Sequence, residues 1–221
     1  MANLADSGCR LLVFAKAPQP GKVKTRLIPA LGAEGAADLH KHMVKRALLA
    51  ATESALGAVE LWCAPDARHP FFAQCRREFG VALRSQRGHN LGERMRRAFD
   101  ASLERSPRAI LVGSDIPALD AGYLRNADWA LRDGCDCVLG PAEDGGYVLI
   151  GLVRPDPELF HGIRWGGPDV LAETRRRIAR LQRRCRELRL LLDIDRPADL
   201  ERLSEVENFN DTVTRRLSWQ S

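Results

Sequence analysis

The feature that most constrains the fold is a run of five apolar residues at positions 11–15, followed by a loop with four cations. No polar residue interrupts the run, which is typical of a strand buried on both faces in a parallel sheet. Open α/β sheets bind ligands at the carboxyl ends of their strands. The loop at residues 16–27 is therefore a candidate ligand site.

This loop is suited to an anion with several charges, such as a nucleotide diphosphate. Its prolines stiffen the backbone, and its glycine lets the backbone approach a ligand. Three of the chain's five lysines lie here, although a solvated basic turn is an alternative. The glycine spacing matches neither a P-loop nor a GxGxxG turn. The residues of the loop that we expect to bind the nucleotide are Lys16, Pro18, Gly21, Lys22, Lys24, Thr25 and Arg26.

Length and composition favour one α/β domain over residues 1–221, with a core at about 10–205. The net charge of +5 is compatible with a phosphorylated small molecule, nucleic acid or a membrane surface. Aromatic residues, at 6%, are not interleaved with the basic clusters, which argues against nucleic acid. The six cysteines contain no CxxC pair, which predicts free thiols in a reducing compartment. The sequence has no apolar run long enough for a membrane span and no export signal, so we expect a cytoplasmic protein.

Apolar periodicity and turn residues predict alternating strands and helices. After the first strand we expect a helix at 35–56, whose His40 and His42 we interpret as exposed or capping residues. We expect another helix after Asn90, which would cap it. The other predicted helices are at 70–79, 120–133, from 169 and at 198–205, and the other strands at 58–64, 81–84, from 109, from 135, at 148–152 and at 188–192.

Carboxylates at predicted strand ends point to a divalent metal. Asp115 ends a buried strand, and Mg²⁺ typically takes one or two protein carboxylates plus phosphate oxygens. The alternative is that Asp115 caps the next helix. Asp193 and Asp195 flank one residue and project from the same side of an extended segment. Together the three would form a cluster for Mg²⁺ or Mn²⁺.

Two glycine-containing loops and one basic helix are further candidate ligand-binding segments. At residues 86–95 a strand-to-helix junction around Gly92 offers backbone amides to a phosphate or a base. The loop at residues 142–147 brings its backbone close to a bound group while Asp144 points at it, unless it is simply a tight turn. The arginine-rich helix after Asp169 is by default a solvated face, with nucleic-acid or membrane binding as the alternative.

In this order, the motifs KAP…GKVKTRL, LGERM, GSDIP, GP…DGGY and DIDRPADL resemble the DUF2064 family of nucleotide-diphospho-sugar transferases. That family is related to the molybdenum-cofactor and phospholactate guanylyltransferases. The resemblance covers roughly residues 10–205, and the KTRL and DGGY elements in combination carry most of it. At Gly88-His89-Asn90 the chain departs from the more acidic Gly-Asp pair expected there.

The resemblance implies a Rossmann-like αβα sandwich of the GT-A type with a mostly parallel sheet. Asp115 would hold the metal, with Asp193 and Asp195 contributing by position. The first loop would bind the nucleotide diphosphate, together with Gly92, Arg94 and Ser114, and the second substrate would meet Gly145, Gly146 and Tyr147.

These observations favour a metal-dependent transferase that moves a sugar from a nucleotide donor to a small-molecule acceptor. Asp115 and Asp144 would be the catalytic residues, with Asp144 contacting the acceptor hydroxyl. One alternative is a nucleotidyltransferase that uses an NTP and releases pyrophosphate. The other, of a different class, is a non-catalytic protein that binds nucleotides or nucleic acid. The sequence leaves the acceptor, the base and the oligomeric state open.

Overall fold

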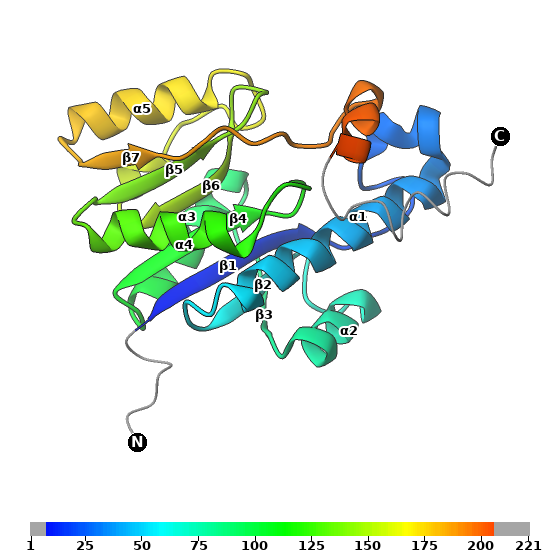
Figure 1. Ribbon diagram of the computed structural model, residues 1–221, viewed down its shortest axis with the longest axis horizontal. Coiled ribbons are helices and arrows are strands. Elements are labelled where there is room, and N and C mark those ends of the chain that lie inside the picture. The colour runs from blue at the N-terminus through cyan, green and yellow to red at the C-terminus, as the bar shows by residue number, and fades with distance from the viewer. Residues whose placement is uncertain (1–7, 206–221) are drawn as a thin grey trace.

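The computed structural model describes residues 8–205, so residues 1–7 and 206–221 of the predicted domain lie outside the described part. A seven-stranded sheet lies between two layers of helices (Figure 1). This confirms the predicted αβα sandwich. The strands are β1 (Cys9–Lys16), β2 (Val59–Ala64), β3 (Ala82–Ser85), β4 (Arg108–Gly113), β5 (Cys137–Pro141), β6 (Tyr147–Leu152) and β7 (Cys185–Glu187).

The sheet has the order β3-β2-β1-β4-β6-β5-β7. The pairings of β1 with β2 and β4, of β2 with β3 and of β5 with β7 are parallel. Only β6 runs against its neighbours, β4 and β5. The sheet is therefore mostly parallel, as predicted.

The central strand β1 is buried on both faces. Leu11 and Val13 pack into the layer that contains α1, α2 and α4, whereas Leu12 and Phe14 pack into the layer of α3 and α5. This explains why the strand has no polar alternation: neither of its faces meets water. Its carboxyl end delivers the basic loop.

The helices form two layers, with α1 and α4 in front of the sheet and α3 behind it in Figure 1. The α-helices are α1 (Ile28–Glu53), α2 (Pro70–Phe79), α3 (Leu91–Leu103), α4 (Ala121–Arg132) and α5 (Val170–Arg180). Short 3-10 helices are η1 (Thr25–Leu27), η2 (Pro157–Leu159) and η3 (Pro197–Glu205). No helix in the described range is long and apolar enough to cross a membrane.

Side-chain caps fix where two helices begin. Asn90 accepts a hydrogen bond from the Glu93 amide at 2.9 Å, which confirms the predicted cap of α3. Asp120 accepts one from the Tyr123 amide at 2.6 Å and so caps α4. The alternative that Asp115 performs this role is therefore wrong.

Two element predictions need correction. The first helix begins at residue 28, seven residues earlier than predicted, and is kinked at Gly32. The helix predicted at 198–205 is confirmed as the 3-10 helix η3, packed beside the start of α1. The last strand is β7 at 185–187, not 188–192. Residues 188–192 still run along β5, to which the Leu188 and Leu191 amides donate, but beyond β7 only an isolated bridge between Ala142 and Leu191 is formed and no regular ladder.

All six cysteines are free thiols, as predicted.

Candidate active site

A cavity of about 510 Å³ opens at the carboxyl ends of β1 and β4. The loop after β1 forms one wall, and Gly113, Ser114 and Asp115 at the end of β4 form another. We call this cavity the cradle. Of the predicted nucleotide-binding residues, those that line the cradle are Lys16, Lys22, Lys24, Thr25, Arg26 and Ser114.

Four other predicted nucleotide-binding residues do not line the cradle. Gly21 belongs to the tight turn in which the Lys22 amide donates to the Gln19 carbonyl at 3.0 Å, and Pro18 lies in the preceding turn, in which the Gln19 amide donates to the Ala17 carbonyl at 2.8 Å. The Arg94 guanidinium donates through Nε to the Gly88 carbonyl at 3.1 Å and so holds the strand-to-helix junction together. Gly92 is buried beneath Trp165.

The cations of the loop have different partners. Lys16 and Lys22 are exposed, and within residues 8–205 neither forms an ion pair. Lys24, by contrast, is 8% exposed, and its ammonium donates to the Ile194 carbonyl and lies 3.0 Å from Asp115 Oδ1. Arg26 pairs with Asp195 at the mouth of the cradle. Lys16 and Lys22 are therefore the cations most available to an anionic ligand.

Asp115 is held in a fixed orientation. Its Oδ1 is enclosed and faces Lys24, although 46% of the whole side chain is exposed. Burial by itself would raise the pKa of Asp115, but Lys24 and His40 outweigh that effect and hold the pKa well below its ordinary value. The remaining exposed part of the carboxylate is available to a ligand in the cradle, so Asp115 is ionised and positioned at neutral pH.

His40 is a site residue that sequence reasoning missed. The prediction that it is exposed is wrong: it is 4% exposed and lies between β1 and β4. Its Nε2 is 3.0 Å from the Lys16 carbonyl, and its Nδ1 is 3.6 Å from Asp115 Oδ1. Because a carbonyl only accepts, Nε2 donates. The only hint in the sequence is that His40 follows Leu39 and precedes Met43 on the helix face that becomes buried.

The loop between β5 and β6 is a tight turn and also lines the site. Asp144 Oδ1 accepts a hydrogen bond from the Gly146 amide at 2.8 Å, and Gly145 has φ +86°. A Cβ at Gly145 would lie 2.0 Å from the Pro168 carbonyl oxygen, so only glycine fits there. The two interpretations of this loop are compatible, because Asp144 also lines the cradle.

A second cavity, of about 300 Å³, adjoins the cradle on the side of α3 and β6. Phe14, Leu91, Gly113, Asp115, Asp144 and Gly166 line both cavities. Its walls are mostly apolar, and Gly146 and Tyr147 of the predicted substrate loop belong to them, whereas Gly145 does not line it. We call it the apolar cavity.

Trp165 closes one side of the apolar cavity. Its indole packs in a stack with Phe160 and edge-on against Tyr147. A Cβ on Gly92 would lie 2.4 Å from Trp165 Nε1 and 2.6 Å from the Phe160 carbonyl oxygen. Gly92 is therefore needed for this wall to dock on α3.

The three predicted metal ligands do not form one preformed cluster. Within the described residues, no group of three or more His, Cys, Asp or Glu is arranged to hold a metal ion by itself. Asp115 and Asp195 line the cradle and are each paired with a cation, while Asp193 lines the apolar cavity. Burial, followed by the nearby carboxylate of Asp144, raises the pKa of Asp193 to about 6.

The fold and the site together define an α/β domain of the nucleotidyltransferase and GT-A type, and three solved structures share it. A protein from Desulfovibrio desulfuricans G20, provisionally named a nucleotide-diphospho-sugar transferase, is 32% identical, with a TM-score of 0.83 over 96% of this chain and 94% of its own. The inositol-1-phosphate CTP transferase from T. maritima is 12% identical, with a TM-score of 0.61 over 96% of this chain and 99% of its own.

A third structure is CMP:2-keto-3-deoxy-manno-octonic acid synthetase complexed with CTP. It is 12% identical, with a TM-score of 0.56 over 90% of this chain and 97% of its own. At this identity the last two structures support the fold alone.

The sequence profile of DUF2064, described as an uncharacterized protein conserved in bacteria, matches residues 47–167. The chain belongs to the DUF2064 family, as its motifs predicted. A comparison with curated proteins finds no match.

Proposed function

We propose that this protein is a transferase that binds a nucleotide-activated substrate in the cradle and moves a group from it to an acceptor in the apolar cavity. The favoured donor is a nucleoside diphosphate sugar, and the compartment is the cytoplasm. The observation that carries the proposal is that Asp115 and Asp144 line both cavities. Two substrates bound there would meet at these carboxylates.

The donor's phosphates would bind beside Lys16 and Lys22. Both cations are exposed, lie at the carboxyl end of β1 and have no competing ion pair in residues 8–205. Fixed cations stabilise the charge that develops on phosphate oxygens when a nucleoside diphosphate leaves. Lys24 would contribute indirectly, because its ammonium is engaged with Asp115 and the Ile194 carbonyl.

Mg²⁺ or Mn²⁺ is the proposed cofactor. The exposed part of the Asp115 carboxylate fits an ion that is completed by substrate phosphates, because Mg²⁺ commonly binds through only one or two protein carboxylates. Such an ion would neutralise the charge on the leaving diphosphate. Asp193 and Asp195 would support it from either side.

The acceptor would enter with its apolar part among Met95, Leu111 and Trp165. Asp144, at the junction of the cavities, would accept the proton from the acceptor hydroxyl. The acceptor oxygen would bond to the anomeric carbon of the sugar, and the bond from that carbon to the diphosphate oxygen would break. The nucleoside diphosphate would leave with the electron pair.

Nucleotidyl transfer is a second candidate, favoured by the fold shared with the CTP-dependent enzymes. In that reaction the acceptor oxygen would bond to the α-phosphorus of an NTP, and pyrophosphate would leave. The cradle would serve both reactions, because both break a bond next to a metal-bound phosphate.

The test is a thermal-shift panel of nucleotides and nucleotide sugars, with and without Mg²⁺ or Mn²⁺, followed by product analysis. A ligand at a hundred times its dissociation constant stabilises the native state by about 2.7 kcal/mol. A metal-dependent shift with one nucleotide sugar and release of nucleoside diphosphate supports glycosyl transfer, whereas an NTP shift with pyrophosphate release supports nucleotidyl transfer. A panel with no shift would contradict both.

A further inference from the structure

A groove of about 770 Å³ runs between strand β3 and helix α3, apart from the cradle. It shares no lining residue with the cradle. Four arginines line it and only one acidic residue, Glu104, does. The arginines are Arg84, Arg87, Arg97 and Arg105.

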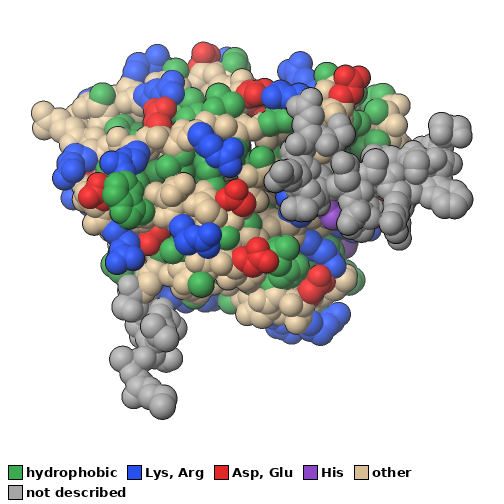
Figure 2. Space-filling view, viewed as in Figure 1, with side chains coloured by type: hydrophobic (Ala, Val, Ile, Leu, Met, Phe, Trp, Pro, Cys, Tyr) green, Lys and Arg blue, Asp and Glu red, His purple; other side chains and the backbone are tan. Residues whose placement is uncertain are grey.

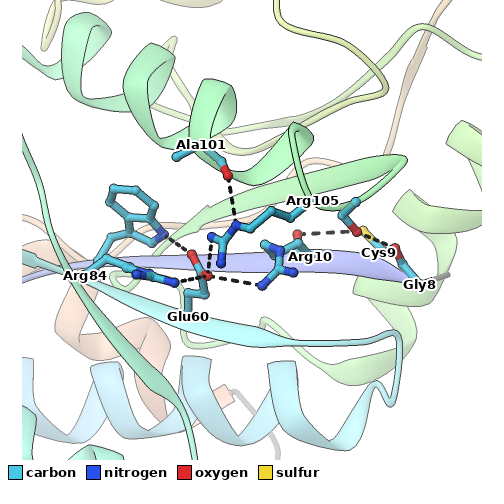
Figure 3. A network of polar contacts seen from close by, with 9 residues as sticks. Gly8, Cys9, Arg10, Glu60, Arg84, Ala101 and Arg105 are labelled. Atoms are coloured by element: carbon cyan, nitrogen blue, oxygen red, sulfur yellow. Dashed lines mark hydrogen bonds and ion pairs between the residues drawn. The ribbon is translucent and has the colours of Figure 1, made fainter. Parts of the chain in front are cut away.

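A buried glutamate orients the guanidinium groups on one side of this groove (Figure 3). Glu60 is 1% exposed, and its Oε1 accepts hydrogen bonds from Arg84 at 3.4 Å and from Arg105 at 2.9 Å. The same oxygen accepts one from Arg10 at 3.2 Å, and Oε2 accepts one from the Trp62 indole at 3.1 Å. Arg84 and Arg105 are nevertheless 42% and 40% exposed.

The positive charge of this region is only partly neutralised. One carboxylate faces three guanidinium groups, and within residues 8–205 neither Arg87 nor Arg97 has an ion pair. Arg87 and Arg97 are exposed on the same groove. Guanidinium groups held this way match the oxygens of a phosphate, which they bind with paired hydrogen bonds.

We propose that the groove is a second anion site that binds a small molecule with two or more linked phosphate groups. The volume lies in the range of small-molecule sites. Four cations around one groove suit a ligand with several linked phosphates better than a ligand with a single carboxylate. Trp62, the aromatic residue of the lining, is only 6% exposed, so it offers no surface on which nucleic-acid bases could stack.

This proposal is independent of the transferase function and is tested by binding. The probe is inorganic tripolyphosphate without metal, titrated by calorimetry into the full chain. The groove variant carries Arg87→Gln and Arg97→Gln, two exposed substitutions that leave the Glu60 contacts in place. The matched control carries Arg76→Gln and Arg77→Gln on α2, and a cradle variant carries Lys16→Ala and Lys22→Ala.

We expect the groove variant to lose about tenfold or more in affinity at one site, since bonds to charged groups are the strong ones. The control and the cradle variant would keep that site. Thermal denaturation of all variants would establish that they are folded. Equal binding by the groove variant and its control would overturn the proposal. So would a single-stranded RNA that binds in the groove more tightly than tripolyphosphate, because the site would then belong to nucleic acid.

Discussion

The loop at residues 16–27 and helix α5 are both basic, but their charges are used differently. The four arginines of α5 are paired with acidic side chains, and Figure 2 shows basic and acidic groups interspersed across one face of the molecule. In the loop, Lys16 and Lys22 have no such partner in residues 8–205. Within α5, Glu173 pairs with Arg176 and Arg177. Glu158 of η2 pairs with Arg180, and Asp156, just before η2, pairs with Arg183.

The difference teaches that the number of cations does not identify an anion site. Charges that are already neutralised by neighbours gain little from a ligand, whereas an unpaired lysine at a strand end gains a full interaction. Pairing along α5 therefore weakens the alternative that this helix binds nucleic acid.

Replacing Glu60 by Gln should destabilise the protein by about 3 kcal/mol, because removing one partner of a buried ionic cluster leaves charges uncompensated. Three guanidinium groups would then lie together without a carboxylate. Urea denaturation would measure the loss, with the exposed Glu104→Gln as control. Equal stability of the two variants would show that the charge of Glu60 is not needed.

Asp115→Asn should reduce turnover about a hundredfold, because the variant would lose the carboxylate that holds the proposed metal ion, and removing one electrostatic contribution to the transition state usually costs about that much. The amide cannot pair with Lys24 as a carboxylate does. Steady-state kinetics at several Mg²⁺ concentrations would measure the effect, and Asp133→Asn on the surface is the control. Full activity that ignores metal would remove Asp115 from the mechanism.

Replacing Lys16 and Lys22 together by Ala should weaken nucleotide binding about tenfold, because the phosphates lose one charge-assisted contact for each ammonium that is removed. The thermal-shift midpoint of nucleotide titrations would report the change. Folding should be unaffected, since both side chains are exposed. Unchanged binding would make the loop the solvated basic turn considered at first.

Asp193→Asn should raise the melting temperature by about 2 °C at pH 7.5 and much less at pH 5. The pKa of Asp193 is raised to about 6 by burial and by Asp144, so the folded state holds its proton more tightly than the unfolded state. The ionised carboxylate therefore lowers stability above pH 6, and this penalty fades as the pH falls toward 4. Melting curves recorded in EDTA would measure the difference in melting temperature between the variant and the wild type. A larger gain at pH 5 than at pH 7.5 would contradict the raised pKa of Asp193.

The smallest effect is expected in α5. Arg176→Ala with Arg180→Ala should change stability by less than about 1 kcal/mol, because exposed ion pairs contribute little. Both side chains are more than 60% exposed. Activity and binding to short RNA should match the wild type. A marked, salt-sensitive loss of RNA binding would revive the nucleic-acid alternative.

Much of the framework could be predicted locally. The unbroken apolar run of β1, the cap at Asn90 and the strand that leads to Asp115 can each be read from a few neighbouring residues. The prediction of the last strand at 188–192 is wrong because Leu188 and its neighbours are as apolar as a strand, whereas in the fold they make only scattered hydrogen bonds and one isolated bridge to the segment that contains β5. Pairing with a distant strand leaves no local signal.

The order of residues along the chain is enough to predict the layered α/β fold, the basic loop at the end of β1 and the family, because these depend on periodicity and on motifs. Which charges are free depends instead on contacts that form when the chain folds. In the folded protein Lys24 turns inward to Asp115, and His40 is buried between the Lys16 carbonyl and Asp115. Three arginines gather around Glu60. These contacts join residues far apart in the chain, and a side chain's partner depends on how the strands are ordered in space.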